Sequence, residues 1–243
     1  MKSYIIAEIA SNWEGDIRIA NKIIRKCKLA DANAVKFQMW RAKDLYSEKH
    51  PLWKFIKKSE LTFDKAKKIK KFCDENKIEF FCSAFYPEAV DFLEKIKVKK
   101  FKIASRTCLL KDPFSLETLQ KKSETKKPLI ISMGMGGDKE KIKRILKSNE
   151  KTFCYCISKY PTKFLDIDWN EAVKYDGFSD HTIGITAPLV FATLKRKQNS
   201  KKIVIEKHIK LAESKGPDAS SSIDTDELSQ MVSLIRNIEK MKI

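Results

Sequence analysis

Short runs rich in Ile, Val and Phe recur along the chain, separated by stretches whose apolar residues are spaced three and four apart. The runs are apolar throughout rather than alternating, which is typical of parallel strands covered by helices. The spacing between them predicts amphipathic helices. The eight runs occupy residues 4–10, 34–40, 78–85, 99–105, 128–134, 152–158, 175–181 and 202–208.

Eight strand–helix units within 243 residues predict an α/β protein, a single-domain (β/α)8 TIM barrel over residues 1–243. An open, doubly wound sheet is the alternative. The barrel is favoured because no G-x-G-x-x-G turn follows the first run and the chain holds only seven glycines. Thr62 or Asp64, and Asp224 or Thr225, offer N-cap oxygens for two of the helices.

The chain is strongly basic, with 50 Lys and Arg against 32 Asp and Glu, a formal charge of +18. Such an excess can indicate nucleic-acid binding through backbone phosphates. The lysines, however, are scattered over the predicted helices, without an arginine cluster or a nucleic-acid motif. We therefore expect no nucleic-acid partner, and the positive field favours an anionic substrate.

Several features indicate a cytoplasmic protein without a membrane partner. No apolar run approaches the roughly 20 residues of a membrane span. Glu8 interrupts the first apolar run, and no signal-peptide cleavage site follows it. The six cysteines show no C-x-x-C spacing, so we expect reduced thiols. Cys82 and Cys108, which lie near predicted strand ends, are candidates to line a site.

Polar and ionisable residues lie at the end of every predicted strand. In a TIM barrel these ends meet at the face that carries the active site. Packing alone does not require polar groups at all eight ends, so the pattern predicts a functional site. In chain order the residues are Glu8, Lys36, Gln38, Ser83, Lys102, Ser105, Ser132, Ser158, Tyr160, Ser179, Asp180, His181, Glu206 and His208.

Lys36 and Lys102 lie inside the runs "AVKFQ" and "FKIAS", where the apolar neighbours predict burial. Lysines accompanied by serines and backbone amides suit a ligand with a phosphate and a carboxylate group. Lys207 lies between Glu206 and His208 on one strand. It should therefore point to the opposite face and have a structural role.

His181 and His208 end neighbouring predicted strands, in "SDHTIG" and "IEKHI". Two such histidines can share a divalent cation, with waters or substrate oxygens at its open positions. Asp180 and Glu206 are candidates to orient the imidazoles. The alternative is two buried histidines, each held by a backbone hydrogen bond. The third histidine, His50, has no comparable neighbours and is interpreted as incidental.

The chain resembles the sialic acid synthase family, which includes N-acetylneuraminate, legionaminate and pseudaminate synthases. The resemblance covers almost the whole chain and rests on motifs in the family's order: "IIAEIASNWEGD", "AVKFQ", "FKIAS", "CISKYPT", "SDHTIG", "IEKHI" and "GPD". It implies a metal-dependent barrel that condenses phosphoenolpyruvate with an N-acylated hexosamine such as N-acetylmannosamine and releases phosphate.

The resemblance also implies a role for each matching residue. His181 and His208 would bind the metal, Mn²⁺ or Mg²⁺, and Glu8 would handle protons when water is added. Gln38, Tyr160 and Asp218 would face the sugar. Phosphoenolpyruvate would be held by Lys36, Ser83, Lys102, Ser105, Ser132, Ser158 and Ser179.

The chain departs from the family pattern at several positions. Trp13 stands where the family usually has His, and Arg106-Thr107 replaces Gly-Glu after "KIAS". Ala84 replaces a proline, and Ala219 a histidine. The sequence stops at Ile243, without the antifreeze-like domain that supplies a sugar-binding arginine in relatives. We expect that a separate antifreeze-like protein supplies this domain, that the sugar differs, or that the reaction has been lost. Arg106 is either a substitute for the missing arginine or a solvated loop residue.

The same residues are compatible with other functions. Lys36 or Lys102 could form a Schiff base, as in an aldolase-like lyase. The loss of a carboxylate at Thr107 favours a catalytically altered or inactive relative that binds phosphoenolpyruvate or sugar. A homodimer is a further candidate assembly. Nucleic-acid binding rests on charge alone.

Overall fold

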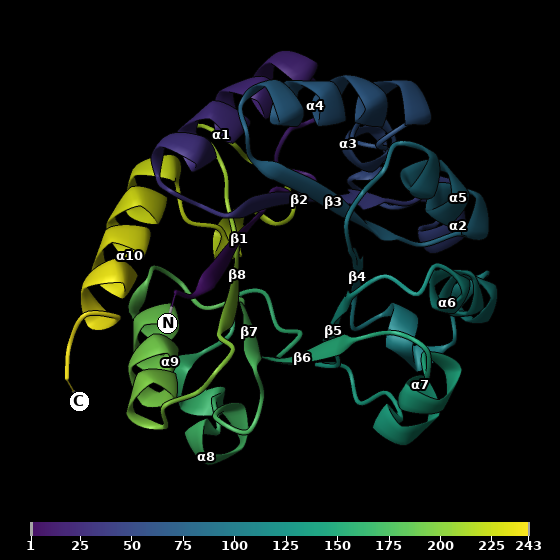
Figure 1. Ribbon diagram of the computed structural model, residues 1–243. Helices are drawn as coiled ribbons and strands as arrows, with labels where there is room; N and C mark the ends of the chain where they lie inside the picture. The colour runs from purple at the N-terminus through teal and green to yellow at the C-terminus, as the bar shows by residue number, and fades with distance from the viewer. Residues whose placement is uncertain (1, 243) are drawn as a thin grey trace.

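The computed structural model describes residues 2–242 and shows eight parallel strands closed into a barrel, in the order β1 to β8 (Figure 1). The strands are β1 (Tyr4–Glu8), β2 (Ala34–Met39), β3 (Glu79–Ala84), β4 (Phe101–Ile103), β5 (Leu129–Ser132), β6 (Lys151–Cys156), β7 (Gly177–Asp180) and β8 (Val204–His208). Each coincides with one of the eight apolar runs, although β6 begins one residue before its run, at Lys151. The (β/α)8 TIM barrel is therefore confirmed, and the open doubly wound sheet is excluded.

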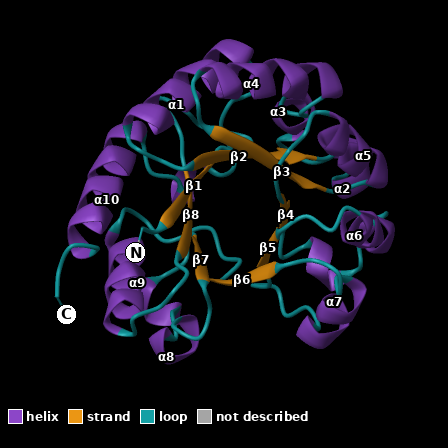
Figure 2. Ribbon diagram, viewed as in Figure 1, coloured by secondary structure: helices purple, strands orange, loops and turns teal. Residues whose placement is uncertain are grey.

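The helices form a ring around the outside of the barrel (Figure 2). They are α1 (Ile17–Leu29), α2 (Ala42–Leu45), α3 (Trp53–Lys58), α4 (Phe63–Glu75), α5 (Pro87–Lys95), α6 (Ser115–Glu124), α7 (Lys139–Ile145), α8 (Trp169–Ala172), α9 (Thr186–Lys197) and α10 (Thr225–Ile238). Three 3₁₀ turns, η1 (Thr107–Leu109), η2 (Phe164–Asp166) and η3 (Ala219–Ser221), lie in the loops. Thr62 caps α4, and Asp224 caps α10 in a capping box with Glu227.

Inside the barrel, an apolar layer lies beneath the strand ends. It is formed by Ile6, Ala34, Phe81, Ile130, Cys154 and Val204. Because side chains along a strand alternate between faces, residues two positions further on also point inward. In β1, β2 and β8 that step leads from the apolar layer to Glu8, Lys36 and Glu206. The alternation of side chains along the strands thus places ionisable groups directly above this apolar layer.

Lys207 takes the opposite face of β8, as the alternation predicts. It is fully buried, and its ammonium group lies 2.7 Å from Asp180 Oδ2. Asp180 also accepts hydrogen bonds from the backbone and hydroxyl of Thr182. The expectation that Asp180 orients an imidazole is wrong, because its carboxylate is directed to Lys207 behind the strand.

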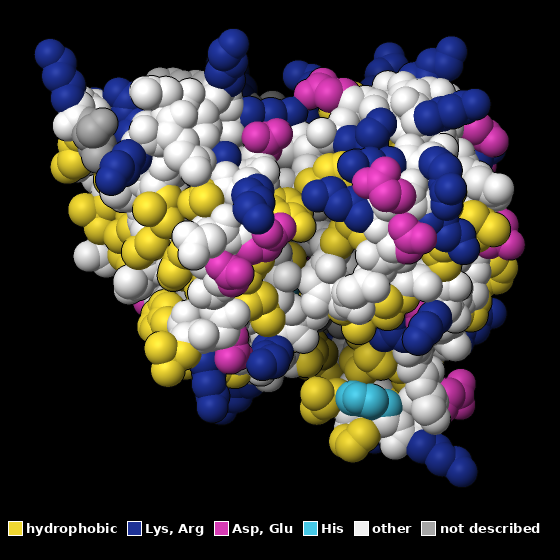
Figure 3. All heavy atoms as spheres, turned by 90° about the horizontal axis from the view of Figure 1, so that it is seen from below, with side chains coloured by type: hydrophobic (Ala, Val, Ile, Leu, Met, Phe, Trp, Pro, Cys, Tyr) yellow, Lys and Arg dark blue, Asp and Glu magenta, His cyan; other side chains and the backbone are white. Residues whose placement is uncertain are grey.

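The surface of the described residues carries its basic groups in a scattered pattern. Figure 3 shows Lys and Arg side chains spread over one face, with Asp and Glu between them. Many lysines lie in exposed pairs with acids, such as Lys202 with Glu150 at 2.7 Å. In residues 2–242, no helix has the length and apolar character needed to cross a membrane.

The seam between β3 and β4 is the least paired in the barrel. Only Ser83 and Lys102 are in register there, whereas every other seam has three or more registered pairs. Lys122 of α6 spans this seam, donating hydrogen bonds to the carbonyls of Ala84, at 2.8 Å, and Lys102, at 3.1 Å. Burial lowers the pKa of Lys122 to about 7.

We expect Lys122→Met to change the pH dependence of stability. The pKa of Lys122 is near 7 in the folded chain and 10.5 in the unfolded chain, because the buried ammonium is disfavoured. Below pH 7 the folded chain must bury this charged form, so its free energy of unfolding is lowered most there. The folded chain should therefore gain stability as the pH rises from 7 to 10, by at most about 1.4 kcal/mol per pH unit. Urea unfolding at pH 7, 8, 9 and 10 should show less of this gain in Lys122→Met.

The neighbouring Lys121 provides the control, because its side chain is partly exposed and its pKa is raised by Asp91. Lys121→Met should follow the unmodified chain over this pH range. Parallel stability curves for Lys122→Met and the unmodified chain would show that the buried ammonium has no such effect.

Candidate active site

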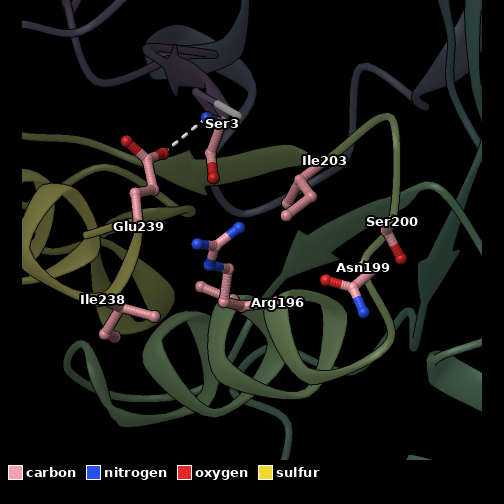
Figure 4. Close-up of a pocket in the computed structure, with 8 residues that line it drawn as sticks. Ser3, Arg196, Asn199, Ser200, Ile203, Ile238 and Glu239 are labelled. Carbon is pink, nitrogen blue, oxygen red and sulfur yellow. Dashed lines mark hydrogen bonds between the residues drawn. The ribbon is translucent and has the colours of Figure 1, made fainter. Parts of the chain in front are cut away.

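The carboxyl ends of the strands enclose a pocket of about 390 Å³. By contrast, the hollow between α9 and α10 in Figure 4 measures about 10 Å³, barely enough for one water. The large pocket is lined by Lys36, Gln38, Trp40, Leu45, Tyr46, Phe85, Lys102, Ala104, Ser105, Arg106, Ser132, Met135, Cys156, Ser158, Tyr160, Ser179, His181, Glu206, His208, Pro217 and Asp218.

The floor of the pocket is a buried group of charges. Glu206 lies 3.3 Å from the ammonium of Lys102 and 3.6 Å from that of Lys36. Lys36 also forms an ion pair with Glu8, which is completely buried beneath it. None of these four side chains is more than 4% exposed.

The charges of the floor set one another's pKa values. Burial alone would raise the pKa of Glu206, but Lys102 and Lys36 outweigh it and hold that pKa at about 2. Burial would lower the pKa of Lys102, yet the attraction of Glu206 raises it above 10.5. For Lys36 the effect of burial is larger than the attraction of Glu206, and its pKa falls to about 8. Glu206 is therefore a carboxylate at neutral pH.

Serines at the strand ends hold the charged groups in place. Lys36 donates a hydrogen bond to Ser83 at 3.2 Å, and Lys102 donates one to Ser132 at 2.7 Å. The hydroxyl of Ser179 donates to Glu206 at 2.6 Å. Ser105 accepts from the backbone of Gly134 at 2.9 Å. Ammonium groups fixed in this way are oriented before any ligand arrives.

His181 and His208 lie side by side, with ring centroids 5.3 Å apart. Nδ1 of His181 donates to the carbonyl of Ile157 at 2.7 Å, which leaves Nε2 free. Nδ1 of His208 is buried and has no hydrogen-bond partner. The ring of Tyr160 packs against that of His181, with centroids 4.2 Å apart and planes tilted by 37°. His181 thus fits the alternative of a buried histidine held by a backbone hydrogen bond, and His208 does not.

Most of the expected site residues line the pocket, but Asp180, which pairs with Lys207, does not, and neither do Glu8 and Ser83. Glu8 and Ser83 are both buried below the floor, where Glu8 also accepts a hydrogen bond from Gln38 at 3.1 Å. Asp218 lines the pocket and accepts a hydrogen bond from Ser11. Tyr160 stands at the rim and is 49% exposed. Ser158 lines the pocket between the floor and this rim.

The cysteine that faces the pocket is Cys156. Cys82 and Cys108, the two candidates from the sequence, are buried away from it. Cys156 precedes Ser158 by two residues, so the alternation that directs Ser158 inward applied to it as well. All six cysteines are free thiols.

Sequence analysis also missed an apolar side of the pocket. It is formed by Trp40, Leu45, Tyr46, Phe85, Met135 and Pro217. Leu45 ends the short helix α2, and the other five residues lie in loops beyond the strand ends, so the alternation of a strand applies to none of them. Arg106 lies in a different loop, after β4, and donates to Asp112 at 2.5 and 2.8 Å and to the carbonyl of Leu45. Arg106 is therefore a paired cation, and its side chain is 36% exposed.

A barrel with buried lysines and an imidazole pair at its mouth defines an α/β-barrel protein with a charged pocket at the strand ends. The NeuB family matches residues 23–242 of the chain. The chain belongs to the NeuB family, which confirms the resemblance to sialic acid synthases.

Individual relatives agree with this assignment. The chain is 30% identical to the N,N'-diacetyllegionaminic acid synthase of Campylobacter jejuni, over 98% of this chain and 77% of that protein. It is 29% identical to the N-acetylneuraminate-9-phosphate synthase of Homo sapiens, over 98% and 70%. Its structure matches the N-acetylneuraminic acid synthetase of Leptospira borgpetersenii, in complex with citrate, with a TM-score of 0.87 and 26% identity, over 99% and 85%.

We expect Glu206→Gln to destabilise the chain by about 3 kcal/mol or more at pH 7, because two buried lysines lose a shared partner. Glu206 has a lowered pKa, so its stabilising effect is complete above pH 4.5 and declines as the pH falls toward 2. The difference between the two chains in urea unfolding should therefore shrink from pH 6 to pH 3.

Glu150→Gln is the matched control, because Glu150 pairs with Lys202 on the surface. It should cost less than about 1 kcal/mol. A Glu206→Gln chain as stable as this control would contradict the proposed electrostatics of the floor.

Proposed function

We propose that this chain is a phosphoenolpyruvate-dependent nonulosonate synthase. It condenses phosphoenolpyruvate with an N-acylated hexosamine of the N-acetylmannosamine type and releases phosphate. The observation that carries the proposal is the pair of buried lysines, Lys36 and Lys102, facing one pocket beside two imidazoles. Membership of the NeuB family, with nonulosonate synthases among the relatives, supports it. The free cysteines are consistent with a reducing cytoplasm.

The floor suits phosphoenolpyruvate because it offers two fixed ammonium groups and several hydroxyls. Phosphate and carboxylate groups both form their strongest hydrogen bonds with charged donors. Lys36 and Lys102 bind these groups, and Ser105, Ser132, Ser158 and Ser179 supply further hydrogen bonds. Ser83 acts from below by holding Lys36. The acceptor sugar lies above this anion, between Gln38, Tyr160 and Asp218.

His181 and His208 are the residues that would hold a divalent cation, Mn²⁺ or Mg²⁺. The buried and unpartnered Nδ1 of His208 and the free Nε2 of His181 are both available as ligands. No group of three or more candidate ligand side chains occurs in residues 2–242, so waters or substrate oxygens complete the coordination. When bound, the cation supplies Lewis acidity toward the aldehyde oxygen of the open-chain sugar.

In the proposed reaction, the methylene carbon of phosphoenolpyruvate forms a bond to the aldehyde carbon. Water adds to the resulting cationic carbon, and the C–O bond to phosphate breaks. The floor holds phosphoenolpyruvate so that its methylene carbon faces the aldehyde, which reduces the entropic part of the barrier. Glu206 stays ionised and positions the lysines. Glu8 lies below the pocket, where it pairs with Lys36 and accepts a hydrogen bond from Gln38, so it would exchange protons with the pocket through the ammonium of Lys36.

The open mouth of the pocket favours a covering element from a second polypeptide. Tyr160 is half exposed at the rim, beside the aldehyde position. An antifreeze-like domain protein, or the second copy in a homodimer, would exclude water and order the acceptor. Because Arg106 is held by Asp112, it is a weaker substitute for an arginine brought by such a partner.

A Schiff-base lyase is the second candidate, because the pKa of Lys36 is lowered to about 8. A buried lysine with a lowered pKa is a competent amine nucleophile. Borohydride reduction in the presence of pyruvate would attach pyruvate to Lys36 in a lyase. The proposed synthase forms no imine and should stay unmodified.

The proposed function predicts phosphate release from phosphoenolpyruvate only when Mn²⁺ and an N-acylated hexosamine are both present. Lys36→Ala and Lys102→Ala should each weaken phosphoenolpyruvate binding by about 2 kcal/mol or more, as expected for a lost charged partner. Titration calorimetry measures this without turnover. Lys159→Ala is the control, because Lys159 is an exposed lysine near the mouth that pairs with Asp166. Equal affinities in all three variants would overturn the proposal.

His181→Ala and His208→Ala should each weaken Mn²⁺ binding by at least about tenfold, because each removes one of two imidazole ligands. Calorimetry or electron paramagnetic resonance of the substrate-free chain measures the affinity. His50→Ala, the remaining histidine, should bind Mn²⁺ as the unmodified chain does. Undiminished binding in both site variants would restore the interpretation of two structural histidines.

A further inference from the structure

The connections at the two ends of the barrel differ in charge. Those that precede the strands, at the amino-terminal end, hold eleven lysines, no arginine and three acids, which are Asp31, Glu150 and Asp176. Those that follow the strands, around the pocket, hold twelve basic and twelve acidic residues, with α2 and α3 counted among them. The basic excess of the connections thus lies at the end opposite the pocket.

Most of the lysines at the amino-terminal end have no acidic partner. Five of the eleven form ion pairs. The other six are exposed and pair with no acid among the described residues: Lys77, Lys97, Lys99, Lys126, Lys147 and Lys201. Unpaired ammonium groups gathered at one end of a molecule repel one another, and they raise the local concentration of anions.

A hollow of about 290 Å³ opens at the same end of the barrel. Its floor includes Ile130 and Val204, which belong to the apolar layer inside the barrel, and Tyr4 packs against that layer at its side. The lysines that line it are Lys2, Lys100, Lys201 and Lys202. The hollow therefore combines an apolar floor with a basic rim.

The side of the hollow is held in place by a carboxylate. The hydroxyl of Tyr4 donates to Glu79 at 2.6 Å. The ammonium of Lys100 lies 3.3 Å from the same carboxylate and 4.0 Å from the centroid of the Tyr4 ring. Glu79 also lines a second hollow, of about 280 Å³, together with the unpaired Lys77 and Lys99. The two hollows are thus neighbours, and we call them, with the six unpaired lysines, the basic face.

The basic face matches a protein better than it matches other polyanions. Arginine is the side chain best suited to nucleic-acid phosphates, and these connections have none. Bases stack on exposed aromatic side chains, and membrane-surface proteins insert apolar ones. None of the exposed large apolar side chains of the described residues lies in these connections. An acidic protein segment offers carboxylates for the lysines and an apolar side chain for the hollow.

The size of the hollow agrees with a single anchoring side chain. Pockets for whole small ligands measure roughly 300–1,000 Å³, so a hollow of about 290 Å³ is at the lower limit. An apolar anchor in a pocket with a polar rim is a common arrangement at protein interfaces. We propose that the basic face docks an acidic segment of a partner protein, with one apolar side chain in the hollow and carboxylates on the unpaired lysines.

The test measures fluorescence anisotropy of labelled probes with the full chain. The probes are a peptide of glutamates with one central leucine, the same peptide with a central serine, and an oligouridine RNA. Sedimentation with phosphatidylserine vesicles tests membrane binding. We expect the leucine peptide to bind most tightly, and at least about threefold more tightly than the serine peptide, because only leucine fills the apolar hollow. Its affinity should fall as salt is added.

Each other outcome would contradict part or all of the proposal. Tighter binding of the RNA or of the vesicles would overturn the choice of a protein partner. Equal binding of the two peptides would overturn the anchoring role of the hollow. No binding of the leucine peptide would overturn the docking surface itself.

Two double variants separate the basic face from net charge. Lys99→Glu with Lys201→Glu should weaken binding of the leucine peptide at least about tenfold. Lys49→Glu with Lys163→Glu makes the same change of charge at exposed lysines that follow the strands, and it should weaken binding by no more than about twofold. Phosphoenolpyruvate affinity should be retained in both, because none of these lysines lines the pocket. Equal weakening of peptide binding by the two double variants would show attraction by net charge alone and overturn the proposal.

Discussion

The barrel mouth depends on one buried carboxylate, Glu206, placed between the ammonium groups of Lys36 and Lys102. Two lysines stripped of water this close together would repel each other, and their burial is tolerable only with opposite charge at hand. Glu206 supplies it from one side and Glu8 from below. Because Ser179 fixes Glu206 and Ser132 fixes Lys102, the cations keep one geometry and can serve as a preformed anion site.

Alternation along the strands explains why this charged layer lies where it does. The apolar layer below it excludes water from the barrel interior. The charged groups are therefore buried on their lower side, and their upper side faces the pocket. The arrangement requires each strand to keep its register, and the seam of β3 and β4 has the fewest ladder bonds to keep it. Lys122 ties Ala84 to Lys102 across that seam. Lys122, which is buried outside the pocket, thus holds the strand that carries Lys102 inside it.

The sequence predicted those parts of the site that depend on strand geometry. Lys36, Lys102 and His208 lie in or at the end of apolar runs, and a period of two fixes their direction. The same period directs Cys156 into the pocket and Cys82 away from it, so it would have identified Cys156 as the cysteine that lines the site. Tyr46 and Phe85 lie beyond strand ends, where loop conformation decides their position. The Arg106–Asp112 pair depends on the turn that contains η1. Such contacts arise from tertiary packing, and no local pattern encodes them.

The charge balance of the floor also bears on how the proposed ligands would bind. Two lysines face two glutamates there, so the empty floor is close to neutral. Phosphoenolpyruvate would add a carboxylate and a phosphate that carries about −1.5 to −2 charges at pH 7. That excess needs compensation nearby, and the imidazole pair is the remaining place in the pocket for a divalent cation. Cation and phosphoenolpyruvate should therefore strengthen each other's binding by the same factor, as linkage requires. The formal charge of +18 on the chain would assist the approach of such an anion.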